Sequence, residues 1–305
     1  MYGGIFMDEK DFLILHHIEQ ERSITKASEL LYTSQPALSY RIKKIEEKLG
    51  VQIFIRGSKT LEFTPEGEYI ISFARKMLTR YQIFNDNLSN INSQDTGNLR
   101  IAVTNITSRY YLPQILKEFT ETYPQINIDI TTGTSPLVIN SLEEESVHVG
   151  IIRGDYNWNE GKKLIGKEDI CLISNRPIDM MKLPEMPRIA YKVNTTEMHK
   201  KSNHNENVNL MGKIQSWWNE RYPISPFNKM EVESFETCKE MVRYGLGYAI
   251  IPRVFIQPED NLYIEKLVFK NGEAITRNTW LLYRNSTLQL KYVNNFIAKF
   301  ENYDE

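Results

Sequence analysis

Cysteine is scarce in this 305-residue chain, and long apolar runs are missing from it. The two cysteines, Cys171 and Cys238, lie far apart, so the sequence shows no disulfide framework and no cluster of thiols. No stretch approaches the ~18 consecutive apolar residues of a membrane span, and no secretory apolar segment is visible. We therefore expect a cytoplasmic protein with reduced thiols that does not enter a membrane.

An excess of charge of one sign is also missing. With 37 basic and 39 acidic residues the formal net charge is −2, so any contact with nucleic acid must come from a local patch. Residues 36–60 supply such a patch, because six cations stand against Glu46 and Glu47 and leave +4. The six cations are Arg41, Lys43, Lys44, Lys48, Arg56 and Lys59.

Motifs of catalysis are missing as well. The chain has no nucleophile elbow, no phosphate-binding loop and no His or Cys cluster at metal-ligand spacing. We therefore expect no enzyme, no bound metal and no other cofactor. The length and the 41% hydrophobic content predict two or three compact units.

Residues 25–49 predict two short helices separated by a tight turn. Ser34 is a good N-cap for the second helix, and Pro36 falls in its first turn, where a missing N–H costs nothing. Apolar residues then recur at spacings of about one helical turn and define a buried face. They are Leu38, Ile42, Ile45 and Leu49.

The opposite face of that second helix carries amide, hydroxyl, aromatic and cationic groups, with no acid before Glu46. Such a face fits a major groove, where Gln and Arg read base edges while Lys and Ser hold phosphates. The alternative is an ordinary helical hairpin with a solvated basic face. The residues expected to contact DNA here are Ser34, Gln35, Pro36, Ser39, Tyr40, Arg41 and Lys44.

A β-hairpin is predicted next, with strands at 51–56 and 61–63 around the turn at 57–59. A hairpin after a helix-turn-helix forms a wing. Arg56 and Lys59 at its tip could enter a minor groove or hold phosphate, and the alternative is that both are plain surface cations. Residues 1–64 are thus expected to form a winged helix-turn-helix domain.

Residues 65–92 predict one long helix with a strict seven-residue apolar repeat. A lone helix would leave this repeat in water, so we expect it to pair with a second copy in a homodimer, which also suits palindromic DNA. The alternative is that the repeat packs on the chain's own body. The repeat consists of Ile70, Ala74, Met77, Tyr81, Phe84, Leu88 and Ile91.

Residues 93–98 are predicted to be a hinge, and an α/β pattern fills residues 99–305. Strands at 99–103, 126–130 and 147–152 alternate with helices, which implies a parallel sheet with right-handed crossovers. A strand pair at 162–174 and a surface loop at 199–209 are expected beyond it. Ligands bind past the carboxyl ends of such strands, where hydroxyl-rich turns at 104–108 and 131–135 precede helix N-termini that favour anions.

From Met7 onward the chain resembles the LysR-type transcriptional regulators. Gln35-Pro36-Ala37-Leu38-Ser39 lies at the centre of a segment similar to the family's helix-turn-helix signature. Ile53-Phe54-Ile55-Arg56 and Phe63-Thr64-Pro65-Glu66-Gly67 resemble its wing and the start of its linker helix. Tyr123-Pro124, Gly133-Thr134-Ser135 and the segment from Val242 to Pro252 resemble landmarks of its effector domain.

The resemblance implies an α/β fold in which a winged helix-turn-helix and a long linker helix precede a two-lobed effector domain like the periplasmic binding proteins. Lobe I is expected at about 99–170 plus 272–305, and lobe II at about 171–271. The resemblance also implies a tetramer built as a dimer of dimers, whose DNA bend changes when a small molecule binds.

Individual roles follow from the resemblance at matching positions. Gln35, Pro36, Ser39 and Arg56 match positions that contact DNA, while Tyr40 stands where the family often has Arg. Thr104 and Ser135 match positions that bind a ligand's carboxylate, and the expected effector set also includes Asn105 and Arg153. The alternatives for these effector residues are a helix cap and a surface arginine.

The expected function is a LysR-type regulator that binds a pseudo-palindromic promoter site as a dimer or tetramer and responds to a small, carboxylate-bearing effector. Its partners would be double-stranded DNA, further copies of the chain and the effector, with RNA polymerase as a further candidate. Two alternatives are a thiol-based redox sensor using Cys171 and Cys238, and a small-molecule carrier suggested by the two-lobed half.

Overall fold

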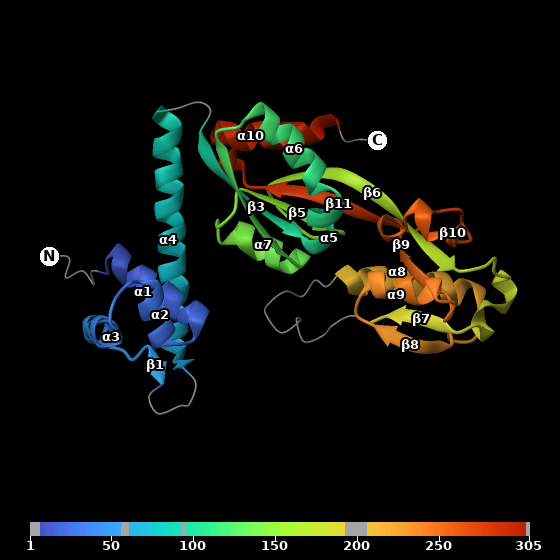
Figure 1. Ribbon diagram of the computed structural model, residues 1–305, viewed down its shortest axis with the longest axis horizontal. Helices are drawn as coiled ribbons and strands as arrows, with labels where there is room; N and C mark the ends of the chain where they lie inside the picture. The colour runs from blue at the N-terminus through green and yellow to red at the C-terminus, as the bar shows by residue number, and fades with distance from the viewer. Residues whose placement is uncertain (1–6, 56–60, 93–95, 193–205, 303–305) are drawn as a thin grey trace. The chain divides into compact units, whose positions relative to one another are not determined.

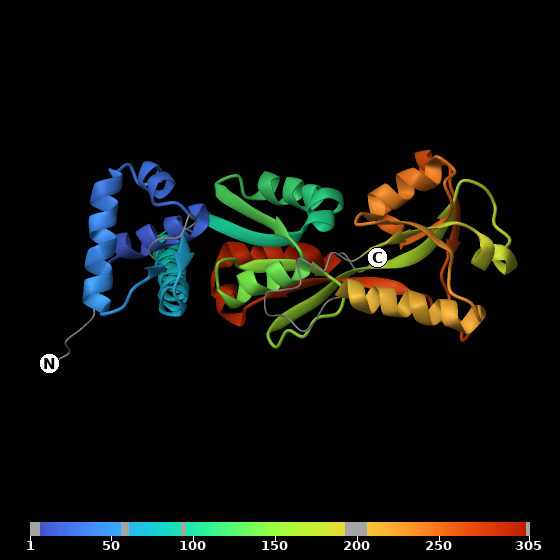
Figure 2. The same cartoon turned by 90° about the horizontal axis from the view of Figure 1, so that it is seen from below.

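The computed structural model describes residues 7–55, 61–92, 96–192 and 206–302. The chain divides between Gln94 and Asp95 into two compact units, with residues 144–146 grouped with the first. Figures 1 and 2 show the elements of both units in two views.

Three helices build the core of the first unit: α1 (Glu9–Glu21), α2 (Ile24–Leu30) and α3 (Gln35–Leu49). Asp8 and Asp11 form a capping box that satisfies backbone N–H groups at the start of α1. The three helices bury one shared apolar cluster that includes Leu15, Ile18, Ala27, Leu38, Ile42 and Ile45. The predicted helix-turn-helix is therefore present.

A short wing and a long helix complete the first unit. Strand β1 (Phe54–Ile55) pairs antiparallel with β2 (Glu62–Phe63), so the wing strands are shorter than the predicted ones. Helix α4 (Pro65–Asn92) is one continuous helix, as the sequence predicts, and its first half packs against α1 (Figure 1).

Three parallel strands form the centre of the second unit. Strand β3 (Gly97–Thr104) lies between β4 (Ile126–Gly133) and β5 (Val149–Arg153), with Ile101 aligned with Ile130 on one side and Val149 on the other. The helices of this part are α5 (Asn105–Tyr110), α6 (Leu112–Thr122), α7 (Ser135–Glu143) and α10 (Lys291–Ala298).

Strand β6 (Gly161–Ser174) is a single strand of 14 residues, where the sequence suggested a pair of strands. Its first part pairs antiparallel with β11 (Thr276–Tyr283), and its last part pairs with β9 (Ala249–Pro252) and β10 (Tyr263–Lys266). β6 therefore connects lobe I to lobe II.

Lobe II is built on a parallel strand pair, β7 (Arg188–Tyr191) and β8 (Asn228–Val232). Helix α8 (Glu206–Arg221) contributes Trp217 and Trp218, and helix α9 (Phe235–Arg243) contributes Cys238, to one apolar core with β9. Short 3-10 turns are η1 (Met180–Glu185), η3 (Arg253–Phe255), η4 (Pro258–Asp260), η5 (Asn285–Gln289) and η6 (Lys299–Asn302).

Two boundary predictions are wrong. The last two residues of the predicted hinge at 93–98, Gly97 and Asn98, belong to β3. A Cβ at Gly97 would lie 2.5 Å from the Tyr292 ring, so the glycine permits close packing. The stretch 105–108 is helical in α5 and not a turn, and the Thr104 and Thr107 hydroxyls contact each other at 2.8 Å across its first turn. The expected loop at 199–209 lies outside the described residues up to 205, and 206–209 are helical.

Candidate DNA-binding face and effector cleft

Helix α3 has the local signals that the sequence predicts for a recognition helix. The Ser34 side chain accepts a hydrogen bond from the backbone N–H of Ala37 at 3.4 Å, and Pro36 occupies the first turn. Gly50 ends the helix in the left-handed region with φ +69°, which a residue with a Cβ adopts only with strain. These caps and the buried apolar face fix which side of α3 is exposed.

The exposed side of α3 presents most of the residues expected to contact DNA. Gln35 and Tyr40 are exposed, and the Gln35 amide donates to the Ser39 hydroxyl at 3.1 Å. Lys44 lies 2.7 Å from Glu47 and 5.6 Å from the Tyr40 ring. Exposed ion pairs of this kind are worth ~0–1 kcal/mol, so they leave Lys44 able to exchange Glu47 for a phosphate.

Arg41 differs from these residues because it is held by α1. Its Nε donates to Asp11 at 2.8 Å, and its Nη2 lies 2.6 Å from Asp8. Asp11 is 1% exposed, and its hydrogen bond is the main cause that raises the pKa of Arg41. The negative charges of Asp8 and Asp11 offset two of the four net positive charges counted for residues 36–60. Through these contacts Arg41 holds α1 against α3.

The base of the wing is tied to α4 by Thr64. Its hydroxyl donates to the backbone carbonyl of Gln52 at 2.6 Å and accepts from the N–H of Gly67 at 2.9 Å. A Cβ at Gly67 would lie 2.1 Å from the Ile53 carbonyl oxygen, so only glycine allows this approach. Arg56 and Lys59, expected at the wing tip, lie outside the described residues.

The apolar repeat of α4 is divided between the unit's own core and its surface. Ala74 is 0% exposed, and Ile70 and Met77 pack against the same helical core, as the alternative reading of the repeat predicted. Tyr81, Phe84 and Leu88 are exposed, and Ile91 lies where side chains are not described. Two exposed aromatics extend the surface part toward the start of the helix, namely Tyr69 and Phe73. We call Tyr69, Phe73, Tyr81, Phe84 and Leu88 the α4 stripe.

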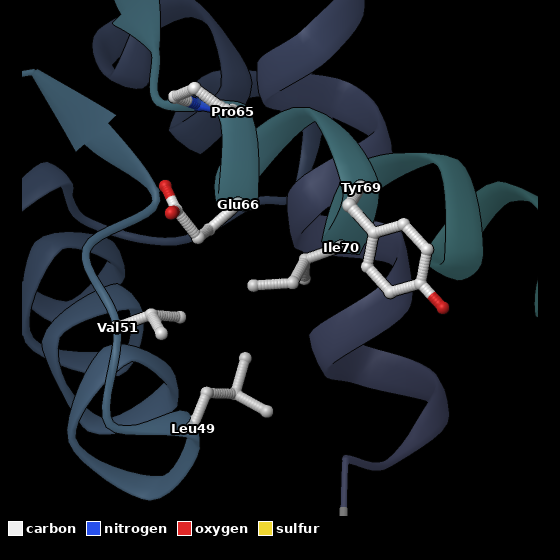
Figure 3. Close-up of a pocket in the computed structure, with 6 residues that line it drawn as sticks. All are labelled: Leu49, Val51, Pro65, Glu66, Tyr69 and Ile70. Carbon is white, nitrogen blue, oxygen red and sulfur yellow. The ribbon is translucent and has the colours of Figure 1, made fainter.

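An apolar pocket lies at the start of the α4 stripe, where the end of α3 meets α4 (Figure 3). Leu49, Val51 and Ile70 point into it, and Tyr69 stands at its rim. Pro65 and Glu66 complete the lining. The sequence does not predict this pocket, because Leu49 was assigned to the end of a helix and Val51 to the start of a strand.

The predicted effector residues lie at one edge of the parallel sheet in the second unit. Thr104 ends β3, Arg153 ends β5, and Ser135 begins α7 after β4. The Ser135 hydroxyl is 3.3 Å from the backbone nitrogen of Arg153, so the fold brings these two together. Thr104 and Ser135 are buried, whereas Asn105 is exposed.

Two acids that the sequence analysis missed compensate the cations of this region. The guanidinium of Arg153, 1% exposed, forms an ion pair with Glu168 of β6, which is 9% exposed. On α9, the Glu236 carboxylate accepts from Arg109 at 2.5 Å and from the Tyr110 hydroxyl at 2.8 Å. These contacts join α5 of lobe I to the first turn of α9 in lobe II.

Comparisons with known proteins place the chain in a family. Residues 10–68 match the model of the bacterial regulatory helix-turn-helix protein, lysR family, and residues 92–303 match that of the LysR substrate binding domain. The chain belongs to the LysR-type transcriptional regulators. It is 38% identical over 291 residues to the uncharacterized HTH-type transcriptional regulator YraN of Bacillus subtilis, covering 95% of this chain and 96% of that one.

Other LysR-type regulators also match over nearly the whole chain, at lower identity. The chain is 34% identical to the HTH-type transcriptional regulator CysB of Haemophilus influenzae, covering 94% of this chain and 87% of that one. The crystal structure of full-length CbnR complexed with the target DNA matches with a TM-score of 0.68 at 18% identity, over 97% of this chain and 100% of that chain. This match shows the fold: an N-terminal helix-turn-helix followed by a two-lobed α/β domain. The family consists of transcriptional regulators and not of enzymes.

The two cysteines of this LysR-type regulator are free and buried. Burial raises the pKa of Cys171 and of Cys238 to about 11. A redox-sensing thiol needs a thiolate that is accessible at neutral pH, and neither cysteine meets that requirement. The structure therefore offers no support for the thiol-sensor alternative.

In the described part of the chain, no group of three or more His, Cys, Asp or Glu side chains is arranged to hold a metal ion. No helix described there is both long and apolar enough to cross a bilayer.

Proposed function

We propose that this LysR-type regulator binds a pseudo-palindromic promoter site through the exposed face of α3, as a dimer or a tetramer, and that a small carboxylate-bearing effector modulates this binding. The observation that carries the proposal is the chemistry of that face. Gln35, Ser39, Tyr40 and Lys44 lie on a well-capped helix, and among the described residues their side chains make local, weak contacts.

The roles proposed on DNA follow from side-chain chemistry. Gln35 lies in the first turn of α3, where its amide can form two hydrogen bonds to an adenine edge in the major groove. Lys44 and the Ser34 and Ser39 hydroxyls are suited to phosphates. Arg41 contributes by holding α1 and α3 together, and Arg56 and Lys59 remain predicted contacts of the wing.

Dimerisation is proposed to occur through the α4 stripe. Tyr69 and Leu88 lie equally far from the midpoint between Leu78 and Thr79, and so do Phe73 and Phe84. An antiparallel pair centred on that midpoint would set Tyr69 against Leu88 and Phe73 against Phe84, and would cover the exposed apolar side chains of both copies. The partner's Leu88 would then lie beside the apolar pocket at Tyr69. A two-fold dimer also presents two α3 helices to two half-sites.

The effector is proposed to bind between the lobes, at the sheet edge that carries Thr104, Asn105, Ser135 and Arg153. Parallel sheets bind ligands at this edge, and the hydroxyls there suit a carboxylate. Arg153 already has Glu168 as a counter-ion, so an effector carboxylate would have to share or replace that acid. RNA polymerase remains a candidate partner.

A gel-shift experiment tests the proposed function. The full-length protein is titrated against DNA from upstream of its own gene at several salt concentrations, with random DNA as competitor. We expect a specific complex whose size fits a dimer or tetramer and which weakens steeply with salt, because phosphate contacts release counter-ions. Absence of binding at low salt, with the protein folded, would contradict the proposal.

The effector part needs a separate measurement. Central carboxylic acids and amino acids are screened for a change in thermal unfolding, with neutral sugars and cations as controls. We expect saturable stabilisation by a carboxylate that Ser135→Ala weakens. Stabilisation by cations or neutral sugars alone would contradict a carboxylate effector.

A further inference from the structure

Arg188 is a buried arginine without a counter-ion among the residues that the structure describes. It is the first residue of β7 and is 8% exposed. Its backbone N–H donates to the carbonyl oxygen of Phe227 at 2.8 Å, and its backbone forms a bridge with Tyr248. Its buried Nε has no hydrogen-bond partner among the described residues.

Two further polar groups lie beside this guanidinium. Tyr248 is 0% exposed, and its hydroxyl has no hydrogen-bond partner in the described part of the chain. Cys238 of α9 is 1% exposed. Arg188 and Tyr248 are paired in a parallel backbone bridge, so their side chains leave the same face side by side. Cys238 packs in the same apolar core as Tyr248.

The cluster contains hydrogen-bond donors and no acidic acceptor. A guanidinium only donates, a tyrosine hydroxyl donates readily, and a thiol is a weak donor. An isolated buried charge costs several kcal/mol, and proteins compensate it with a counter-ion. Arg41 and Arg153 follow this rule in the same chain, since both contact carboxylates. Arg188 departs from it, and burial lowers its pKa without removing its charge.

We propose that Arg188 and Tyr248 form an oxyanion-binding site in lobe II, separate from the effector cleft. The free edge of the guanidinium, with Nε and a terminal nitrogen, matches two oxygens of a carboxylate, sulfate or phosphate. The Tyr248 hydroxyl supplies a third hydrogen bond to the same group. The shared chemistry of the ligand is a small oxyanion that brings the negative charge missing from the cluster.

The proposed site lies beside α9, the helix of lobe II that contacts lobe I. Arg188 is the first residue of β7, and α9 follows β8, the parallel neighbour of β7 (Figure 1). Cys238 belongs to α9, and the first turn of α9 carries Glu236, which contacts Arg109 and Tyr110 of lobe I. An anion held at Arg188 would therefore steady the helix that meets lobe I.

Thermal and urea unfolding of the full-length protein test the site, with tryptophan fluorescence as the signal. Trp217 and Trp218 lie in the core of lobe II and report on this region. Acetate, sulfate and phosphate are titrated separately at constant ionic strength against a chloride background. We expect saturable stabilisation by at least one oxyanion. At 100 times its apparent Kd, the unfolding equilibrium constant should fall about 100-fold.

Arg188→Met should abolish the oxyanion effect. In chloride alone this variant should be as stable as the wild type or more stable, because it replaces an uncompensated buried charge with an apolar side chain of similar length. The acetate arm, compared with the sulfate and phosphate arms, tells a carboxylate ligand from an inorganic one.

Two tyrosine variants provide a matched comparison that does not depend on Arg188. Tyr248→Phe removes a hydroxyl without a partner, so it should leave stability in chloride unchanged and raise the apparent Kd of the oxyanion. Tyr222→Phe removes a hydroxyl that donates to the Met180 carbonyl at 2.8 Å, so it should lower stability equally in every buffer.

Two results would overturn the site. One is equal loss of stability for Arg188→Met in every buffer, which would show that Arg188 is satisfied within the protein. The other is an oxyanion effect that survives in both Arg188→Met and Tyr248→Phe. Neither readout involves DNA, so failure here is distinct from failure of the proposed function.

Discussion

Replacing Arg41 should destabilise the helix-turn-helix unit, although its place on α3 suggests a DNA contact. In Arg41→Ala, Asp11 would lose the guanidinium that lies 2.8 Å from its Oδ1 while remaining 1% exposed. A hydrogen bond to a charged group is worth ~1.5–3 kcal/mol. The Asp8 contact adds little, because that carboxylate is 62% exposed. We expect a loss of about 2–3 kcal/mol.

Hydrogen exchange read by mass spectrometry measures this loss in the full-length protein. All four tryptophans, at positions 158, 217, 218 and 280, lie in the second unit, so their fluorescence does not report on α1 or α3. Protection of the slowest amides in α1 and α3 should fall about 30- to 150-fold. Lys43→Ala is the control, because Lys43 is exposed and lies 4.0 Å from Glu47, and its effect should stay within about 0.5 kcal/mol.

Unchanged exchange in α1 and α3 of Arg41→Ala would refute this reasoning. If DNA affinity of this variant also fell, we would conclude that Arg41 contacts DNA in place of Asp8 and Asp11. Its contacts with these two acids would then not stabilise the unit.

Three further predictions concern other parts of the chain. Gly67→Ala should destabilise the wing and the start of α4 by about 1–3 kcal/mol, because the new Cβ meets the Ile53 carbonyl, and wild-type exchange rates there would contradict this. Both cysteines should resist a thiol reagent at neutral pH until the protein unfolds, since burial raises each pKa to about 11; rapid labelling of the folded protein would contradict it. Although burial acts to raise the pKa of Asp8, hydrogen bonds from the Asp11 N–H and Arg41 hold it below 3.8. This contribution to stability is therefore present above about pH 4 and is lost as the pH falls further, so Asp8→Asn should flatten the acid limb of the unfolding profile.

Helices and strands with strong local signals could be predicted from the sequence. The Ser34 cap, Pro36 and Gly50 define α3, and Thr64-Pro65 defines the start of α4. The parallel order of β3, β4 and β5 also follows from the alternation of strands and helices. These features depend on neighbours in the chain, which a sequence displays directly.

Contacts between distant segments could not be predicted. The pairing of Arg41 with Asp8 and Asp11, and of Arg153 with Glu168, joins residues that no local pattern relates. The heptad repeat of α4 likewise does not reveal that Ala74 faces the unit's own core. The single strand β6 was predicted as a pair of strands, because its pairing with β11 at one end and with β9 and β10 at the other depends on distant segments.

The central claim, that the exposed face of α3 binds DNA, is tested most directly by the salt dependence of DNA affinity. Fluorescence anisotropy is measured on specific and random DNA for the wild type, Lys44→Ala and the control Lys117→Ala in α6. Lys44→Ala should weaken binding to both DNAs by the same factor and reduce the slope of log K against log salt by about 1. Wild-type affinity and slope in Lys44→Ala, or the same change in Lys117→Ala, would contradict the assignment of this face.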